Sequence, residues 1–244
     1  MMTMIHEVPH ADKAILLIHG ILGRPSQFSP FLDAIPKDYS VYNILLDGHG
    51  GNAREFAASN MKKWRMQIMN WVDKLIAQYS SVVIMGHSMG CLFAIQAAFR
   101  YPDRIKAVFL LAPALRIRLT WSAIFGNIKT AFHAAASSGP AERAKLDACG
   151  VTLPSNPLQY LTWLPRFTEL LRESAATRSL ARDLHIPVSV LLSAKDDLVS
   201  PKSADYFGIN AKIRFLPQST HYYYPESDID TIRTELRKLC ESVT

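Results

Sequence analysis

The 244-residue sequence has few cysteines and no long apolar segment. Its three cysteines, Cys91, Cys149 and Cys240, are odd in number and lack metal-ligand spacing, which favours reduced thiols over a disulfide framework. No stretch approaches the roughly 18 apolar residues of a membrane-spanning helix. Residues 1–13 carry charged and histidine side chains where a signal peptide would have an apolar core. We therefore expect a cytoplasmic protein with no membrane span and no bound metal.

Long tracts of one charge are also absent. The formal net charge of +6 is spread along the chain, which predicts a solvated basic surface and no nucleic-acid partner. A hydrophobic fraction of 49% and a charged fraction of 20% are typical of a globular protein with one sizeable core. The sequence leaves the oligomeric state open.

Six short apolar segments alternate with helical patterns. Such segments, rich in Val, Ile and Leu, are typical of strands buried on both faces of a parallel sheet. They cover residues 14–18, 41–46, 81–85, 107–111, 187–192 and, more weakly, 212–216. Apolar periodicity predicts amphipathic helices over 62–79 and near 229–239, and a deeply buried helix over 91–99. The alternation predicts the α/β class, with right-handed crossovers and a doubly wound sheet.

Residues 113–184 interrupt this alternation. They lack a strong strand signal, carry several prolines and are rich in apolar side chains. We interpret them as a helical insertion that packs at the sheet edge and caps a pocket, while residues 1–112 and 185–244 form the core. Because ligands bind beyond the carboxyl ends of strands in open sheets, Trp121, Phe125 and Trp163 are expected to line the substrate pocket.

The segment Gly86-His87-Ser88-Met89-Gly90 fits the pattern G-x-S-x-G between an expected strand and an expected helix. A sharp strand-to-helix turn strains the middle residue and crowds the two outer residues, which are both glycine here. The turn exposes the serine hydroxyl above the sheet, and the helix N-terminus offers N–H groups to a developing anion. Ser88 is therefore the predicted nucleophile.

A nucleophilic serine needs a histidine base and an acid that orients it. On this kind of turn the chain order is serine, acid, histidine. Of the histidines after Ser88, His133 lies in the insertion and His185 leads into a strand, whereas His221 follows the strand ending near residue 216. The chain order selects His221, because it alone also follows the candidate acids.

Two neighbouring carboxylates, Asp196 and Asp197, follow the strand over 187–192. We predict that Asp196 is the acid and that Asp197 is a solvated neighbour that caps the next turn. Asp47, at the end of another strand, is the third choice. The strand over 107–111 ends in Ala112-Pro113, so it supplies no carboxylate.

An oxyanion hole needs two converging N–H donors, each of which stabilises a transition state by roughly 2.7–4 kcal/mol. Met89, directly after the nucleophile, supplies the first. The loop after the first strand supplies the second, for which Ile21 is preferred over Leu22. His19 and His87 are expected to be structural hydrogen-bonding residues.

The segment from Gly48 to Ala53 fits the dinucleotide-binding pattern G-x-G-x-x-A. That pattern also requires an acid about 20 residues later, at the end of the next strand. Asp73 has the spacing, but it lies inside the helix predicted over 62–79. We therefore predict no nucleotide cofactor, and the sequence contains no P-loop.

Taken together, these motifs resemble the α/β-hydrolase superfamily over nearly the whole chain. The matching segments are His19-Gly20, Asp47-Gly48-His49-Gly50, the serine turn, the region around Asp196 and Ser219-Thr220-His221. Within it, the chain resembles bacterial carboxylesterases and monoacylglycerol lipases with a small helical cap. The resemblance implies triad roles for Ser88, Asp196 and His221. Fewer than 15 residues precede the first strong strand, so a sheet lacking one or two N-terminal strands is expected.

Three functions stay open at this stage. The first is hydrolysis of short- to medium-chain acyl esters, with no cofactor and a small-molecule substrate. The second is a thioesterase or cofactor-free carbon–carbon hydrolase on the same triad, for which Arg116, Arg118 and Lys129 leave room for an anionic substrate. The third is a non-catalytic binding protein, against which retention of the whole triad argues.

Overall fold

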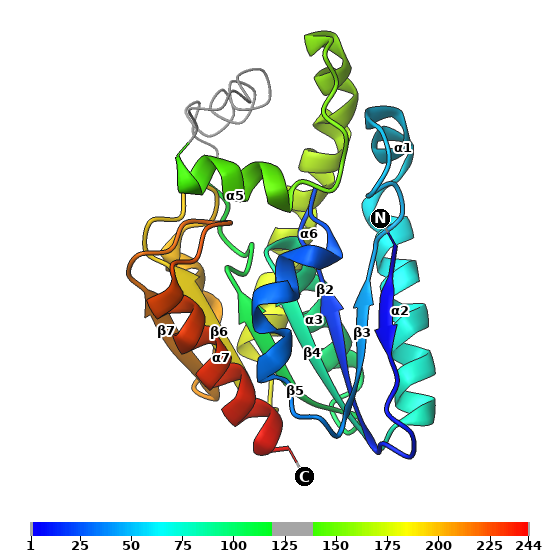
Figure 1. Cartoon of the computed structure of the whole chain (residues 1–244), viewed down its shortest axis with the longest axis vertical. Helices are drawn as coiled ribbons and strands as arrows, with labels where there is room; N and C mark the ends of the chain where they lie inside the picture. The colour runs from blue at the N-terminus through cyan, green and yellow to red at the C-terminus, as the bar shows by residue number, and fades with distance from the viewer. Residues whose placement is uncertain (1, 119–138, 244) are drawn as a thin grey trace.

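A seven-stranded sheet forms the centre of the computed structural model, which describes residues 2–118 and 139–243 (Figure 1). Its strand order is β1-β3-β2-β4-β5-β6-β7, and every neighbouring pair is parallel except β1 and β3. The strands are β1 (Met4–His6), β2 (Lys13–Ile18), β3 (Tyr39–Ile44), β4 (Ser81–His87), β5 (Ile105–Leu111), β6 (Val188–Ser193) and β7 (Ala211–Leu216). The chain order reverses direction across the sheet after β3, which is the doubly wound arrangement predicted from the sequence.

Helices cover both faces of the sheet. The described helices are η1 (Pro25–Ala34), α1 (Ala53–Ala58), α2 (Met61–Gln78), α3 (Met89–Arg100), α5 (Pro140–Ala148), η2 (Pro157–Trp163), α6 (Leu164–Arg182), η3 (Pro201–Tyr206) and α7 (Glu226–Glu241). One apolar core lies between the sheet and helices α2, α3 and α6, and the other lies between the sheet and η1 and α7. Alternate side chains of each strand serve the two cores, as Leu16 and Leu17 do in β2.

The six predicted strands and three predicted helices are confirmed, with ends that move by a few residues. The sequence missed β1, because its three residues are all exposed and carry no buried apolar pattern. It also missed α1, whose start is marked by a capping box: Asn52 accepts from the Glu55 N–H, and Glu55 accepts from the Asn52 N–H. The last two residues of the G-x-G-x-x-A segment, Asn52 and Ala53, are therefore the N-cap and the first residue of α1.

The C-terminal half of α6 packs in the helical layer rather than above the strand ends. Buried Glu173 contacts Arg65 of α2 and accepts from Gln96 of α3, and Ser174 donates to the carbonyl of Leu115. By contrast, α5 lies above the carboxyl ends of the parallel strands (Figure 1). The described part of the predicted insertion thus divides between a packed helix and a helix over the strand ends, and a cap spanning 113–184 stays a prediction.

Within residues 2–118 and 139–243, no helix is both long and apolar enough to cross a membrane. Over the same residues, no cluster of three or more His, Cys, Asp or Glu side chains has the arrangement of a metal site. Cys91, Cys149 and Cys240 are free thiols.

Candidate active site

Ser88 lies at the turn between β4 and α3 with a positive φ of 52°. Non-glycine residues rarely adopt this conformation, and it persists only where the surroundings enforce it. A Cβ on Gly86 would lie 2.7 Å from the Gly90 carbonyl carbon, and a Cβ on Gly90 would lie 2.0 Å from the Ile18 oxygen. Neither position tolerates a side chain, so the predicted crowding across the turn is present.

Three side chains from distant parts of the sequence meet at this turn. His221 Nε2 lies 3.0 Å from Ser88 Oγ, and His221 Nδ1 lies 2.7 Å from Asp196 Oδ2. All three residues are buried. Because a carboxylate only accepts, Nδ1 carries the proton and Nε2 presents its lone pair to the serine hydroxyl. The structure therefore brings together Ser88, Asp196 and His221, the three residues predicted from the sequence.

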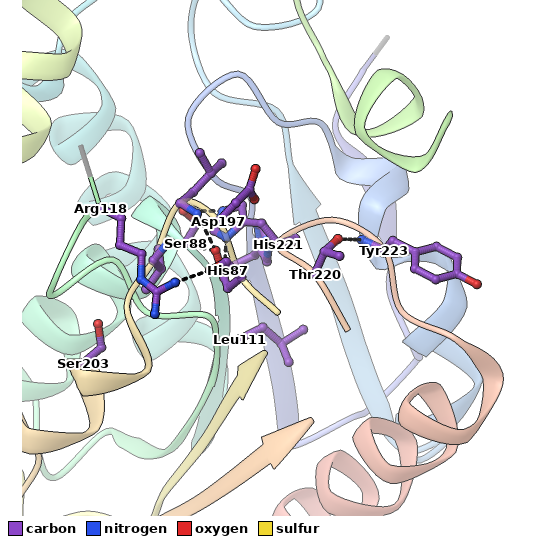
Figure 2. A network of polar contacts seen from close by, with 12 residues as sticks. His87, Ser88, Leu111, Arg118, Asp197, Ser203, Thr220, His221 and Tyr223 are labelled. Atoms are coloured by element: carbon purple, nitrogen blue, oxygen red, sulfur yellow. Dashed lines mark hydrogen bonds and ion pairs between the residues drawn. The ribbon is translucent and has the colours of Figure 1, made fainter. Parts of the chain in front are cut away.

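The carboxylate of Asp196 is held ionised by its surroundings. Burial by itself would raise the pKa of Asp196, but His221 and the N–H groups of Val199 and Leu198 outweigh it and lower that pKa. Oδ1 accepts from those two N–H groups at 2.7 and 2.8 Å. The backbone carbonyl of Asp196 also accepts from Arg118, which links the loop after β6 to the segment after β5 (Figure 2).

Asp197 faces away from this network. Its carboxylate is half exposed and pairs with Lys145 of α5 at 3.5 Å. Asp47, the third choice, accepts from Ser59 and lies beside Lys63. Neither contacts His221, so the geometry favours Asp196 among the three carboxylates that the sequence offered.

Two donors fix the backbone of the His221 loop. His87 Nε2 and the Tyr224 hydroxyl donate to the His221 carbonyl at 3.0 and 3.2 Å. Behind the loop, buried Asp228 of α7 accepts from the Ser219 hydroxyl at 2.6 Å. The backbone that carries His221 is thus fixed at its own carbonyl and at Ser219, two residues before it.

The predicted oxyanion donors lie in two segments that meet beside Ser88. Met89 begins α3, where first-turn N–H groups lack helical acceptors. The β2 loop passes close by, since a Cβ on Gly20 would lie 3.0 Å from Ser88 Cβ. The Leu22 N–H donates to His49 Nε2, which removes this alternative, whereas the Ile21 N–H has no acceptor among the described residues. Ile21 and Met89 remain the proposed pair.

Three buried histidines around the site each have one fixed neutral form. His19 Nδ1 donates to the Gly20 carbonyl while Nε2 accepts from the Leu46 N–H, and His49 is bonded in the same way. Burial lowers the pKa of His87 to about 3 and that of His49 to about 4, and it also lowers the pKa of His19. These histidines hold the loops, as expected for His19 and His87.

The free energy of unfolding is expected to fall as the pH drops below 6.5. The folded state keeps these three histidines neutral, whereas unfolded histidines bind protons below about pH 6.5. Each adds a slope of up to about 1.4 kcal/mol per pH unit, down to about pH 4 for His49. Urea unfolding between pH 7 and pH 5 measures this slope. His49→Gln should reduce it, exposed His10→Gln should not, and a flat profile would contradict the prediction.

A cavity of about 400 Å³ lies on one side of the triad. It is lined by His87, which precedes Ser88, by Leu111, whose carbonyl accepts from the Ser88 N–H, and by Tyr222, the neighbour of His221. Of the predicted lining residues, Trp121 and Phe125 lie outside the described residues. Trp163 is buried against Phe56 instead, and its indole N–H donates to the Ala53 carbonyl. A pocket role for Trp163 has no support among these contacts.

Several supporting residues were not predicted from the sequence. Arg118 was considered for an anionic substrate, but it donates to the backbone of Asp196. Lys129 lies outside the described residues, and the Arg116 N–H donates to Ser203 of η3. Tyr224 and Asp228 stand three and seven residues after His221, a spacing that matches no motif by itself. Proximity to the triad histidine was the one available signal for them.

Comparison with known proteins places these features in a wider group. A family model described as the alpha/beta hydrolase family matches residues 15–233. A dihydrolipoyllysine-residue acetyltransferase component of the acetoin cleaving system from Cupriavidus necator is 30% identical over 41% of this chain and 26% of its own length. A pimeloyl-[acyl-carrier protein] methyl ester esterase from Neisseria meningitidis serogroup C is 30% identical over 45% of this chain and 40% of its own. The chain thus spans less than half the length of these relatives.

Solved structures share the fold over nearly the whole chain. One belongs to work on LipS and LipT, two metagenome-derived lipolytic enzymes; it has a TM-score of 0.73, 20% identity and 97% coverage of both chains. The monoacylglycerol lipase of Paleococcus ferrophilus has a TM-score of 0.66, 18% identity and 98% coverage of both chains. At these identities the likeness extends to the fold alone.

Proposed function

The chain belongs to the alpha/beta hydrolase family, and on this premise we propose that it is a serine hydrolase of carboxylic esters. The proposed substrates are short- to medium-chain acyl esters, cleaved without a cofactor. Ser88 is the proposed nucleophile, His221 the general base and acid, and Asp196 the residue that orients His221. The observation that carries the proposal is the unbroken hydrogen-bonded series from Asp196 through His221 to Ser88 Oγ.

The reaction proceeds in two halves. His221 Nε2 takes the hydroxyl proton of Ser88 as Oγ attacks the ester carbonyl carbon, and the carbonyl π electrons move to oxygen. The N–H groups of Ile21 and Met89 are proposed to hold this oxyanion. Its collapse expels the alcohol, which takes the proton from His221 Nε2. Water then gives a proton to His221 and attacks the acyl-enzyme. The second oxyanion collapses and expels Ser88 Oγ, which takes the proton back from His221 Nε2 as the acid is released.

The surroundings of the triad suit this chemistry. The backbone strain at Ser88 presents Oγ at the carboxyl end of β4, and first-turn N–H groups of α3 surround the same point. Cys91, three residues on, is no competing nucleophile. Burial raises the pKa of its thiol, which donates to the Leu111 carbonyl.

We expect a fluorophosphonate probe to label the protein once per chain, on the peptide containing Ser88. With p-nitrophenyl butyrate, the first turnover should release a burst of p-nitrophenol as the acyl-enzyme accumulates. Absence of both labelling and turnover would favour the non-catalytic alternative. Rates over a series of acyl chain lengths, beside matched acyl-CoA thioesters, separate an esterase from a thioesterase.

Two further expectations remain predictions. A cytoplasmic location is one of them and can be checked by fractionation of the source cells. A cap formed by residues 113–184 can be checked by limited proteolysis with and without a bound phosphonate.

A further inference from the structure

The cavity beside the triad contains several buried polar atoms. It lies between η1, α5 and the segment after His221, and we call it the Arg24 cavity. Arg24 Nε, both polar atoms of the Gln27 amide, and His87 Nδ1 are buried and have no hydrogen-bond partner among the described residues. All three side chains line this one cavity. Buried polar groups in folded proteins almost always have partners, so the unpartnered groups of Arg24 and Gln27 point to a ligand beside them.

Arg24 and Gln27 form one end of the cavity. Arg24 is the N-cap of η1, and the Gln27 N–H donates to its carbonyl, so the two residues belong to the same turn. Gly150, after α5, holds this end in place because its N–H donates to the Leu22 carbonyl. A Cβ on Gly150 would lie 3.0 Å from Arg24 Cβ, so α5 and η1 meet closely here.

The charges of the cavity favour a single negative group. Arg24 is the one lysine or arginine among the described residues that line it, and it forms no ion pair with a described carboxylate. Asp147 of α5 also lines the cavity and is exposed. A second anion nearby disfavours a phosphate dianion, whereas a carboxylate matches one guanidinium and one amide.

His87 contributes an acceptor, not a donor, to the lining of the cavity. Its Nε2 donates to the His221 carbonyl, so Nδ1 presents a lone pair and would repel an anion. Apart from Ser26 and Asp147, the remaining lining is apolar or aromatic and includes Phe28, Phe31 and Ile229. A chain of methylene groups fits such a lining, and the anion belongs at the Arg24 end.

We propose that the Arg24 cavity binds a free carboxylate carried by the ester substrate. The proposal rests on the proposed esterase function and narrows its substrates to esters that bear one carboxylate. The carboxylate is either on the acyl side, as in half-esters of dicarboxylic acids, or on the alcohol side, as in acyl esters of hydroxy acids. Arg24 and Gln27 are then specificity-determining residues outside the triad.

The test compares charged and neutral esters of equal length. On the acyl side, monoethyl esters of dicarboxylic acids with four to eight carbons are paired with ethyl esters of the matching monocarboxylic acids. On the alcohol side, butanoate esters of hydroxy acids are paired with butanoate esters of the matching alcohols. We expect kcat/KM to favour the carboxylate in one series by about tenfold or more, mostly through KM, because a charge-assisted bond forms.

Arg24→Met keeps an unbranched side chain as far as the position of Nε and removes the charged guanidinium end, so it should abolish the preference. Gln27→Leu should reduce the preference, and it provides an independent test of the site if Arg24→Met fails to fold. Both should hydrolyse p-nitrophenyl butyrate within about twofold of the wild-type rate. Arg54→Met, an exposed arginine of α1, should keep the preference and so exclude a general effect of net charge.

The outcomes separate this proposal from the proposed function. If the wild type hydrolyses p-nitrophenyl butyrate but shows no preference in either series, the carboxylate site is wrong and the esterase stands. If it hydrolyses no ester at all, the esterase itself is wrong. A preference that survives Arg24→Met overturns the assignment of the site to Arg24.

Discussion

Replacement of Ser88 by alanine is expected to lower kcat for p-nitrophenyl butyrate by a factor on the order of 10⁶, as for triad deletions in other serine hydrolases. The variant keeps the Cβ and therefore the backbone conformation of the turn. It loses Oγ, whose one hydrogen-bond partner among the described residues is His221. A loss of 10⁶ corresponds to about 8 kcal/mol of transition-state stabilisation.

The measurement is kcat together with fluorophosphonate labelling, which should disappear in the variant. Ser80→Ala, at an exposed serine before β4, is the matched control and should retain both. Circular dichroism and the unfolding temperature should stay close to those of the wild type, because the backbone bonds of Ser88 to Leu111 and Cys91 persist. Wild-type turnover by Ser88→Ala would exclude Ser88 as the nucleophile.

Much of the fold could be predicted because its signals are local. Continuous apolar runs mark β2, β4 and β5, and alternate residues of each run enter opposite cores. Elements stabilised by distant contacts gave no such signal. β1 is exposed along its whole length and exists because its backbone pairs with β3. The packing of α6 depends on Glu173, a charged residue whose burial is compensated by Arg65 and Gln96.

The residues of the site also fall into those that a sequence motif marks and those that none marks. Ser88 and its glycines form a motif with a steric reason at each position, and chain order led from it to His221. The sequence favoured Asp196 over Asp197 but could not decide between them, because the backbone conformation of the loop determines which of two adjacent side chains faces His221. The Arg24 cavity could not be predicted from the sequence. Its polar groups belong to Arg24 before η1, Gln27 within η1 and His87 at the end of β4, and these residues share no motif.

Asparagine at position 196 is expected to lower kcat by about 10⁴, whereas asparagine at 197 should change it by less than about twofold. The two substitutions are chemically identical and adjacent in the chain. Asp196 contacts His221 at 2.7 Å, whereas Asp197 is half exposed and pairs with Lys145. The comparison therefore isolates the position of the carboxylate from its charge.

The size of the effect follows from the hydrogen bonds of Asp196. Its Oδ1 accepts from the N–H groups of Leu198 and Val199, which need an oxygen acceptor. An asparagine keeps its oxygen there and turns its NH₂ group toward His221 Nδ1. His221 must then accept at Nδ1 and carry its proton on Nε2, which faces Ser88 Oγ. In that form it has no lone pair for the serine proton, and a triad in this wrong tautomer loses about 10⁴ in kcat.

A second readout distinguishes this tautomer effect from a loosened site. The heavy atoms of the triad keep their places in Asp196→Asn, so KM should change little while kcat and the rate of fluorophosphonate labelling fall together. Disorder of the loop would instead raise KM and lower the unfolding temperature. If Asp197→Asn proved the more damaging change, Asp197 would be the orienting acid, and the observed contact between Asp196 and His221 would not be the one used in catalysis.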